Sequence, residues 1–470
     1  MEDWKLRLYH QMPAFMRTLI ASGQGYLLRS WRYGSETDSI IADYSAHEKW
    51  SPTQWTAWQE EALAFMLERA ATKVPFYRDQ WSQRRRQGDR SSWELLKNWP
   101  VLSKEDIRAT PLRFVVEDCD VRRMYHEHTS GTTGKSLDLW WSRATVRRWY
   151  ALFEARCRAW HGVSRYDRWA ILGGQLVTPV RQRRPPFWVW NAGLRQLYMS
   201  SYHLAPDLIP SYLDALKRYR ICYLVGYTSS LYMLAVHALR LKRSDLHMQV
   251  VLTNAEPVHE YQRKVIAQAF GCPVRETYGM AELVAAASEC THGRMHVWPE
   301  VGIIEVIRDQ VGDPHHIGGN LVCTGLFNMD MPLIRYEVGD RGSLAKDEAC
   351  TCGCSLPMLG SVEGRADDVL YTVDARQIGR LDPVFKSHLP VIEAQIIQES
   401  LKRIRVRFVP APEYQTRDGQ SMIERLQARM GNVEVILEPM DQLPRESNGK
   451  FRAVISRIKP QEAASLASGQ

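Results

Sequence analysis

The sequence predicts an α/β protein with a large, layered N-terminal domain and a small α+β domain at the C-terminus. Three observations support this fold class. The first 115 residues have helical patterns, short apolar runs then alternate with helical ones up to residue 363, and a compact series of strands and helices follows. We therefore expect three units: residues 1–115 as the helical part of the large domain, residues 116–363 as its α/β core, and residues 364–470 as the C-terminal domain.

The individual elements follow from hydrophobic spacing. Residues 55–71 are amphipathic at helical spacing, and the Val74-Pro75 pair should end that helix. In the core, short apolar runs predict strands at residues 169–172, 222–225, 250–253 and 301–307. Helices are expected at residues 231–241 and 258–269. In the C-terminal domain we expect strands at residues 404–409 and 433–437 and a helix at residues 422–430.

Length and composition indicate an ordinary globular protein, with 470 residues of which 45% are hydrophobic and 24% charged. No segment reaches the roughly 18 uninterrupted apolar residues that a membrane span needs, and the N-terminus does not resemble a signal peptide. We therefore expect no membrane span and a cytoplasmic location. Without a secretion signal, the nine cysteines favour reduced thiols or a metal site over a disulfide framework.

The net charge of +8, from 61 Lys and Arg against 53 Asp and Glu, is compatible with an anionic ligand but does not require nucleic acid. One arginine group, Arg181, Arg183 and Arg184, precedes Phe187 and Trp188, and such mixtures of basic and aromatic residues also occur on nucleic-acid-binding surfaces. A solvated loop is the commoner explanation. We expect no nucleic-acid partner and keep this group as a candidate entrance rim for a substrate.

The clearest functional signal is a segment rich in hydroxyl groups and glycine that ends in a lysine. It consists of Thr129, Ser130, Gly131, Thr132, Thr133, Gly134 and Lys135. Glycine lets backbone N–H groups approach an anion, Ser and Thr add hydroxyl donors, and Lys adds a mobile positive charge. The P-loop pattern requires a glycine where Thr129 stands, so its spacing fails. The segment therefore predicts a phosphate-binding loop outside the P-loop class.

Later segments supply further groups for nucleotide chemistry. Tyr278 offers an aromatic face for a purine, and Glu282 a carboxylate for Mg²⁺. Asp340 follows a glycine at an expected strand end, where it could accept both ribose hydroxyls. Arg365 precedes an acidic pair, and Lys450 follows a glycine turn. Each residue alone also fits an ordinary core, turn or surface role, so the inference depends on their order and spacing.

In that order the segments resemble the adenylate-forming superfamily of acyl-CoA synthetases, nonribosomal adenylation domains and luciferases, over nearly the whole chain. Within it, the sequence is most similar to the phenylacetate-CoA ligase group and its CapK-type branch, which is associated with capsular polysaccharide clusters. Residues 74–78 are similar to an N-terminal phrase of the group. Residues 200–204, 226–231 and 379–382 resemble the CapK branch.

The resemblance implies ATP-dependent adenylation of a carboxylic acid to an acyl-AMP. It implies that Lys450 is the catalytic lysine on a mobile C-terminal lid domain, that Glu282 holds Mg²⁺, and that Asp367 is the hinge. Besides residues 129–135, the implied ATP-binding residues are Ala255, Glu256, Pro257, Thr277, Tyr278, Gly279, Met280, Asp340 and Arg365. The acid pocket is expected at Ser201, Tyr202, His203, Gly226, Tyr227 and Thr228, near Gly173-Gly174. The 16 Trp and 20 Tyr favour an aromatic or otherwise flat acid.

The acceptor of the acyl group is left open. Residues 371–378 depart from the glycine-containing segment that usually follows the hinge in coenzyme A ligases of this group. Coenzyme A, a carrier-protein thiol, or an amine or hydroxyl of a sugar or metabolite all remain candidates. The alternative function is a non-catalytic nucleotide-binding scaffold in a polysaccharide or secondary-metabolite biosynthetic complex, against which Lys135, Glu282 and Lys450 argue.

A candidate zinc site involves two segments. Cys290, His296, Cys350 and Cys352 offer three thiolates and an imidazole, the donor set of a closed structural site. Members of the phenylacetate-CoA ligase group can carry zinc on similar residues. Cys354 and His292 are alternative ligands, and buried free thiols are the alternative to a metal.

Overall fold

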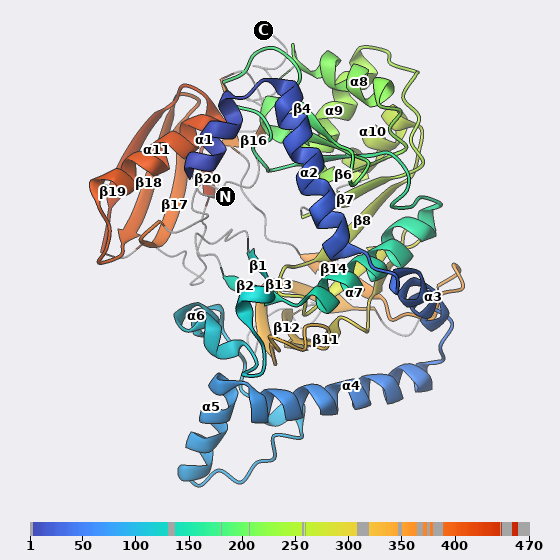
Figure 1. The fold of residues 1–470 in the computed structure, drawn as a ribbon, viewed down its shortest axis with the longest axis vertical. Coiled ribbons are helices and arrows are strands. Elements are labelled where there is room, and N and C mark those ends of the chain that lie inside the picture. Colours follow the sequence, from blue (N-terminus) through green and yellow to red (C-terminus); the bar gives the residue numbers. More distant parts are fainter. Residues whose placement is uncertain are drawn as a thin grey trace.

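The computed structural model describes residues 3–129, 137–179, 181–205, 207–255, 258, 260–307, 319–345, 350–363, 370–373, 377–378, 389–441, 443 and 454–458. The predicted fold class is confirmed (Figure 1). The large domain contains an eight-stranded sheet, a four-stranded sheet and the helices packed on them, whereas the C-terminal domain contains a four-stranded sheet and one described helix. The predicted boundary near residue 364 lies outside the described residues.

The N-terminal part is helical, as predicted. Its helices are α1 (Asp3–Gln11), α2 (Ala14–Arg32), α3 (Thr37–His47), α4 (Pro52–Lys73), α5 (Pro75–Arg86) and α6 (Lys104–Ala109). α4 begins with a capping box, in which the Ser51 side chain accepts from the Gln54 amide and the Gln54 side chain accepts from the Ser51 amide. The helix ends at Lys73 because Val74 is extended before Pro75, which opens α5. No described helix is both long enough and apolar enough to cross a bilayer.

The eight-stranded sheet has the order β10-β9-β8-β7-β6-β3-β5-β4. Its strands are β3 (Trp169–Gly173), β4 (Trp188–Asn191), β5 (Gln196–Ser200), β6 (Tyr223–Tyr227), β7 (Val251–Asn254), β8 (Val274–Gly279), β9 (Ala286–Glu289) and β10 (Met295–Val297). The five strands from β5 to β8 in this order are parallel, and antiparallel strands close both edges. The predicted strands at residues 169–172, 222–225 and 250–253 are therefore confirmed within a residue or two.

Each face of this sheet is covered, because successive side chains point to opposite sides. Ala170 and Leu172 pack into a core with α8 (Ile209–Arg218), α9 (Thr228–Arg240) and α10 (Glu260–Phe270). Trp169 and Ile171 pack on the other face, with α7 (Arg143–Phe153). The parallel strands thus lie between two helical layers, the arrangement that their near-continuous apolar sequence requires.

A π-helical turn, Glu154–Arg158, continues α7. Arg156 on this turn forms a bidentate ion pair with Glu300, at 2.8 Å and 2.6 Å, and neither side chain is exposed to solvent. His47 of α3 lies 3.2 Å from the same carboxylate through its Nδ1. The pair therefore joins α3, the π-helical turn and the connection between two sheets.

The second sheet has the order β11-β12-β13-β14 and is antiparallel. Its strands are β11 (Gly302–Ile307), β12 (Gly319–Gly325), β13 (Tyr336–Leu344) and β14 (Leu359–Glu363), and a separate hairpin contains β1 (Tyr125–His128) and β2 (Asp138–Trp141). This sheet shares one hydrophobic core with α4, α5, α6 and β2. Short 3₁₀ turns at Leu96–Asn98, Pro111–Phe114, Val121–Arg123, Ala159–His161 and Ser201–His203 connect the larger elements.

The C-terminal domain forms a sheet in the order β19-β18-β17-β20, to one side of the large domain (Figure 1). Its elements are β17 (Val391–Ser400), β18 (Arg403–Pro410), α11 (Thr416–Met430), β19 (Glu434–Pro439) and β20 (Val454–Ser456), with a short pair of β15 (Leu370–Tyr371) and β16 (Gln377–Ile378). The three predicted elements of this domain are confirmed. α11 begins six residues before the predicted helix, at Thr416, where Gln415 and Asp418 form a capping box.

Candidate functional site

The β1–β2 hairpin holds the two ends of the predicted phosphate loop together. Thr129 is buried, its amide donates to the Leu137 carbonyl at 3.0 Å, and its hydroxyl accepts from the Leu137 amide at 2.8 Å. His128 and Asp138 pair in register on the two strands. The segment between these anchors, Ser130 to residue 136, lies outside the described residues. The hairpin thus fixes where this loop starts and returns.

Tyr278 and Asp340 meet across two sheets. The Tyr278 hydroxyl, at the end of β8, donates to Asp340 Oδ2 at 3.0 Å, although 62 residues separate them in sequence. The prediction that Asp340 lies at a strand end is wrong, because β13 continues to Leu344. Gly339 has a φ of +82°, and the β12–β13 register shifts beside it. This bulge re-aims the following carboxylate toward β8, and the positive φ favours glycine there.

Glu282, four residues after Tyr278, is buried. Its Oε1 accepts from the Tyr336 hydroxyl at 2.8 Å and lies 3.6 Å from the Lys104 ammonium. Lys104 is the first residue of α6 and was missed at the sequence level, where nothing marks it apart from other lysines. The two contacts fix the orientation of the carboxylate, and both engage the same oxygen.

The proposed adenine segment lies at the carboxyl ends of two neighbouring parallel strands. Asn254 on β7 pairs with Thr277 on β8, and the Thr277 hydroxyl donates to the Thr253 carbonyl at 2.9 Å. Ala255 follows with a φ of +67°, an uncommon conformation for a side chain with a Cβ. Gly279 and Met280 follow Tyr278 at the same edge. Crevices at such strand ends are the usual ligand sites of open α/β sheets.

Residues predicted for the acid pocket gather around Gly173-Gly174. The Ser201 hydroxyl donates to the Gly173 carbonyl at 3.0 Å, and the Tyr202 hydroxyl donates to the Gly174 carbonyl at 2.7 Å. A Cβ on Gly174 would lie 3.1 Å from the Tyr227 hydroxyl. Two tyrosine hydroxyls and a pair of glycines therefore form one small polar cluster.

The remaining predicted pocket residues are structural in this conformation. A Cβ on Gly226 would lie 2.7 Å from the Leu172 carbonyl oxygen, so glycine permits the close approach of β6 and β3. Thr228 is buried at the start of α9. His203 is buried, and its Nδ1 lies 2.9 Å from Ser200 Oγ while its Nε2 lies 3.1 Å from the Pro179 carbonyl oxygen. Both ring nitrogens therefore contact protein atoms.

Tyr202 also contacts the C-terminal domain. Its ring belongs to the hydrophobic cluster that contains Ile396, Phe408 and Met422, and the Arg429 guanidinium of α11 lies 5.6 Å from its centroid. A residue of the predicted acid pocket is therefore part of the interface between the two domains.

The cysteine and histidine residues come together as predicted. Donor atoms of Cys290, His296, Cys350 and Cys352 all lie within 4.8 Å of one another. Cys290 Sγ lies 3.8 Å from Cys350 Sγ, and Cys352 Sγ lies 3.5 Å from His296 Nε2. With Zn–S bonds of about 2.3 Å and Zn–N bonds of about 2.0 Å, tetrahedral geometry places two sulfur donors about 3.8 Å apart and a sulfur and a nitrogen about 3.5 Å apart. The distances therefore fit a tetrahedral zinc ion.

The protonation of His296 suits the same role. Burial lowers the pKa of this imidazole, so it is neutral at pH 7. Nδ1 donates to the Leu356 carbonyl at 3.0 Å, which leaves the lone pair on Nε2, the nitrogen that faces Cys352. Such a carbonyl partner on the second nitrogen is typical of zinc-bound histidine. The Cys354 amide donates to Cys352 Sγ at 3.4 Å, which gives Cys354 a supporting position beside the four donors.

A second group of metal-type donors, His126, His128 and Asp138, lies on the β1–β2 hairpin. Both histidines contact Asp138 Oδ1 at 2.9 Å, and the His126 ring stacks on Trp140. This group was not predicted from the sequence, although two histidines with one residue between them lie on the same side of a strand. Three other sets of predicted site residues lie outside the described part of the chain, namely Glu256 and Pro257, Arg365 and Asp367, and Lys450.

The chain is similar in sequence to a known domain family and to several known proteins. The CapK C-terminal domain family matches residues 370–457. The protein CapK of Staphylococcus aureus is 26% identical over 380 residues, which cover 77% of this chain and 80% of CapK. The phenylacetate-coenzyme A ligase of Thermus thermophilus is 28% identical over 246 residues, 46% of this chain and 55% of that protein.

Solved structures agree on the fold. 2-Hydroxyisobutyryl-CoA ligase, in complex with 2-HIB-AMP and CoA in the thioesterification state, is similar with a TM-score of 0.55 and 20% identity, covering 90% of this chain and 94% of that one. The same ligase in its postadenylation state gives a TM-score of 0.50 at 19% identity. Together with the sequence relationships, these matches show that the chain is homologous to CapK and to the phenylacetate-coenzyme A ligases and shares the fold of an acyl-CoA ligase.

Proposed function

We propose that the chain activates an organic carboxylic acid by ATP-dependent adenylation, and then transfers the acyl group to a thiol, amine or hydroxyl acceptor. The observation that supports this most is the hydrogen bond between Tyr278 of β8 and Asp340 of β13, together with the hydrogen bond of Glu282 with Tyr336 of the same strand β13. Homology to phenylacetate-coenzyme A ligases supports the same chemistry.

The described residues have distinct tasks in this proposal. Asp340 accepts the ribose hydroxyls in place of the Tyr278 hydroxyl, and the Tyr278 ring packs on the adenine. Ala255 and Thr277, at the ends of neighbouring strands, border the same base. The loop of residues 129–135 holds the leaving pyrophosphate, and Lys450 balances the charge that develops when the carboxylate attacks the α-phosphorus.

Mg²⁺ fits the carboxylate of Glu282, because the contacts of Tyr336 and Lys104 in the described part of the chain both engage Oε1 and orient the group. When bound, the ion would supply charge neutralisation on the phosphates. Tyr336 and Lys104 are thus positioning residues for Glu282.

The acid is proposed to enter beside Gly173-Gly174, where the hydroxyls of Ser201, Tyr202 and Tyr227 converge. The abundance of aromatic residues favours an aromatic acid. For the acceptor, coenzyme A is the candidate that the ligase relatives support, alongside a carrier-protein thiol, an amine or a hydroxyl.

Pyrophosphate exchange tests this proposal directly. The full chain should exchange labelled pyrophosphate into ATP only in the presence of its acid, across a panel of aromatic and aliphatic acids. Lys450→Ala should reduce the exchange rate by about 10²- to 10³-fold, the typical effect of removing one electrostatic stabiliser. Lys402→Ala is the matched control, because Lys402 is an exposed lysine of the same domain. Failure of every acid to support exchange above the Lys450→Ala rate would favour the nucleotide-binding scaffold instead.

We also propose that Cys290, His296, Cys350 and Cys352 bind one structural zinc ion. Cys290→Ser and Cys352→Ser should each lower zinc content, measured by metal analysis of the purified protein, from about one ion per chain to a small fraction of that. Cys222→Ser is the control, because Cys222 is a free cysteine outside the cluster. Equal zinc content in all four proteins, or no zinc in the unaltered chain, would contradict the assignment.

A further inference from the structure

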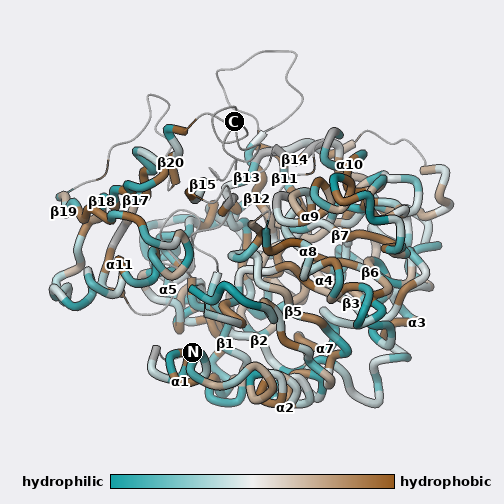
Figure 2. The backbone as a smooth tube through the Cα atoms, turned by 90° about the horizontal axis from the view of Figure 1, so that it is seen from above, coloured by the Kyte–Doolittle hydropathy of each residue, from teal (hydrophilic) through white to brown (hydrophobic). Residues whose placement is uncertain are grey.

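Helix α2 has its apolar side chains on the face that points away from the protein. Figure 2 shows the helix at one edge of the molecule, beside α1. Six large apolar side chains on its outer face are 39 to 66% exposed: Phe15, Met16, Leu19, Ile20, Tyr26 and Leu27. At 100° per residue these positions fall within one contiguous stripe. This is the reverse of the usual surface helix, which buries its apolar face.

The inner face of α2 is small and polar, and specific contacts fix it against the sheet. The Ser22 hydroxyl donates to the Trp190 carbonyl at 3.2 Å and accepts from the Ala192 amide at 3.1 Å. A Cβ on Gly25 would lie 1.7 Å from Asn191 Oδ1, so only glycine fits there. Arg17 is buried and donates to Gln182 at 3.0 Å. The outward orientation of the apolar stripe is therefore built into the packing of α2 on β4.

The preceding helix adds to the same apolar character. Trp4 and Leu8 on α1, one helical turn apart, are 61% and 50% exposed. Scattered exposed apolar residues are normal, but a contiguous row of large ones marks an interaction surface.

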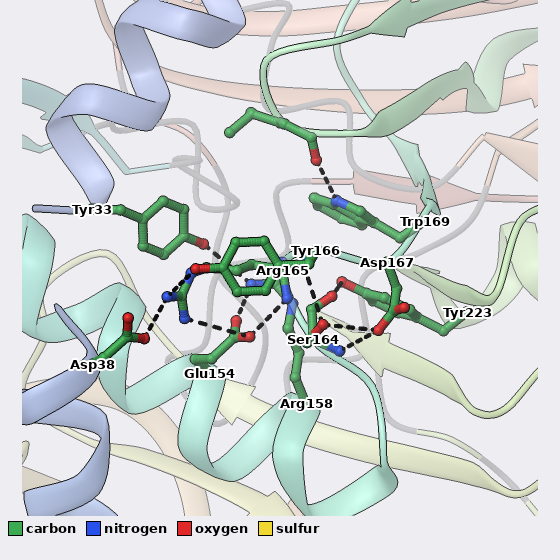
Figure 3. A network of polar contacts seen from close by, with 11 residues as sticks. Tyr33, Asp38, Glu154, Arg158, Ser164, Arg165, Tyr166, Asp167, Trp169 and Tyr223 are labelled. Carbon is green, nitrogen blue, oxygen red and sulfur yellow. Dashed lines mark hydrogen bonds and ion pairs between the residues drawn. The ribbon is translucent and has the colours of Figure 1, made fainter.

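The segment that carries this stripe contains no acidic residue, since residues 4–35 lack Asp and Glu. Of its basic side chains, Arg17 is buried, Arg7 pairs with Glu424 and Arg32 stacks on Tyr150, whereas Arg29 is exposed. Arg29, together with Tyr26 and Tyr33, borders a hollow of about 380 Å³ at the C-terminal end of the stripe. Figure 3 shows part of the wall of this hollow, where Arg165 is paired with Asp38. Arg29 therefore adds positive charge to a wall whose other arginine, Arg165, is already paired.

We propose that the outer face of α2 docks on an anionic phospholipid bilayer. The apolar side chains would enter the boundary between headgroups and acyl chains, and the exposed Arg29 would contact lipid phosphates. A second copy of the chain fits this face less well, because two acid-free, basic segments would repel each other. A helix that lies in the membrane–water interface needs neither the length nor the apolarity of a helix that spans the bilayer.

Co-sedimentation of the full chain with vesicles tests this proposal. The unaltered protein should bind vesicles of phosphatidylcholine mixed with phosphatidylglycerol and bind pure phosphatidylcholine at least about tenfold more weakly. The double substitution Leu19→Glu, Leu27→Glu should reduce binding to the mixed vesicles by more than about tenfold, and Arg29→Glu by about five- to thirtyfold. Leu112→Glu is the matched control, since Leu112 is 57% exposed on another part of the molecule, and should bind like the unaltered chain.

Because the substituted leucines are exposed, the thermal unfolding midpoints of the variants should match that of the unaltered protein. This measurement separates a loss of membrane docking from a loss of folding. Two results would overturn the proposal. One is vesicle binding that is absent, or that survives the Leu19→Glu, Leu27→Glu change. The other is a concentration-dependent dimer in sedimentation velocity that the same change abolishes, which would assign the stripe to a second copy of this chain.

Discussion

Glu300→Gln should lower the free energy of unfolding by about 3 to 5 kcal/mol, because it removes one partner of a fully buried ion pair and leaves the Arg156 charge uncompensated. Burial would raise the pKa of Glu300, but Arg156 and the bond from His47 outweigh burial, so the pKa is lowered from its ordinary 4.5. A lowered pKa means that this stabilisation is present at neutral pH and is lost as the pH falls below about 4.5 toward the lowered value.

Urea unfolding at pH 7 provides the measurement. The matched control is Glu117→Gln, which breaks another bidentate glutamate–arginine pair, with Arg78, in which both side chains are more than 40% exposed. That change should cost no more than about 1 kcal/mol. The double variant Arg156→Met, Glu300→Leu should recover much of the loss, since no buried charge remains. Equal costs for Glu300→Gln and Glu117→Gln would refute the claim that burial sets the strength of the pair.

Asp340→Ala should weaken ATP binding about 10²-fold. In the proposed function this carboxylate accepts both ribose hydroxyls, and hydrogen bonds to a charged group contribute about 1.5 to 3 kcal/mol each. The effect should therefore depend on those hydroxyls. The unaltered chain should prefer ATP to 2′,3′-dideoxy-ATP by a similar factor, and the Asp340→Ala protein should bind the two nucleotides equally.

Equilibrium dialysis with both nucleotides measures this preference without requiring the acid. Tyr278→Phe is the control, because it removes the hydroxyl that contacts Asp340 and keeps the ring and the carboxylate. It should change ATP affinity by less than about fivefold. If Asp340→Ala still discriminated between ATP and the dideoxy nucleotide, Asp340 would not be the ribose ligand.

Much of the fold could be predicted from hydrophobic spacing alone. The strands around residues 169, 222 and 250 could be predicted because parallel strands buried on both faces are apolar along their length. The helices α9 and α10 could be predicted from the helical spacing of their apolar residues. The pairing of distant segments was not available from local patterns. Asp340 is the clearest case, because the bulge at Gly339 and the continuation of β13 depend on the register with β12.

The candidate site was predictable to the extent that its residue types are distinctive. The four candidate zinc ligands could be named because thiolates and imidazole in such a set have few other roles, and the structure brings their donor atoms together. Lys104 could not be named, because its importance comes only from its distance to Glu282. The orientation of α2 was equally hidden, since amphipathic spacing predicts a helix but not which face is buried. The roles of Lys450, Arg365 and Asp367 stay predictions.

Tyr202 connects two events that are usually considered separately. Its hydroxyl is bound to the Gly174 carbonyl in the proposed acid pocket, while its ring lies in the core of the C-terminal domain under Arg429. A substrate that displaced this hydroxyl would therefore disturb the domain interface, and a rotation of the C-terminal domain would disturb the pocket. Thermodynamic linkage makes the coupling reciprocal. If binding of the acid shifts the equilibrium between domain positions by a given free energy, the change in domain position alters the binding free energy of the acid by the same amount. One aromatic ring would thus set how strongly occupancy of the pocket and position of the lid depend on each other.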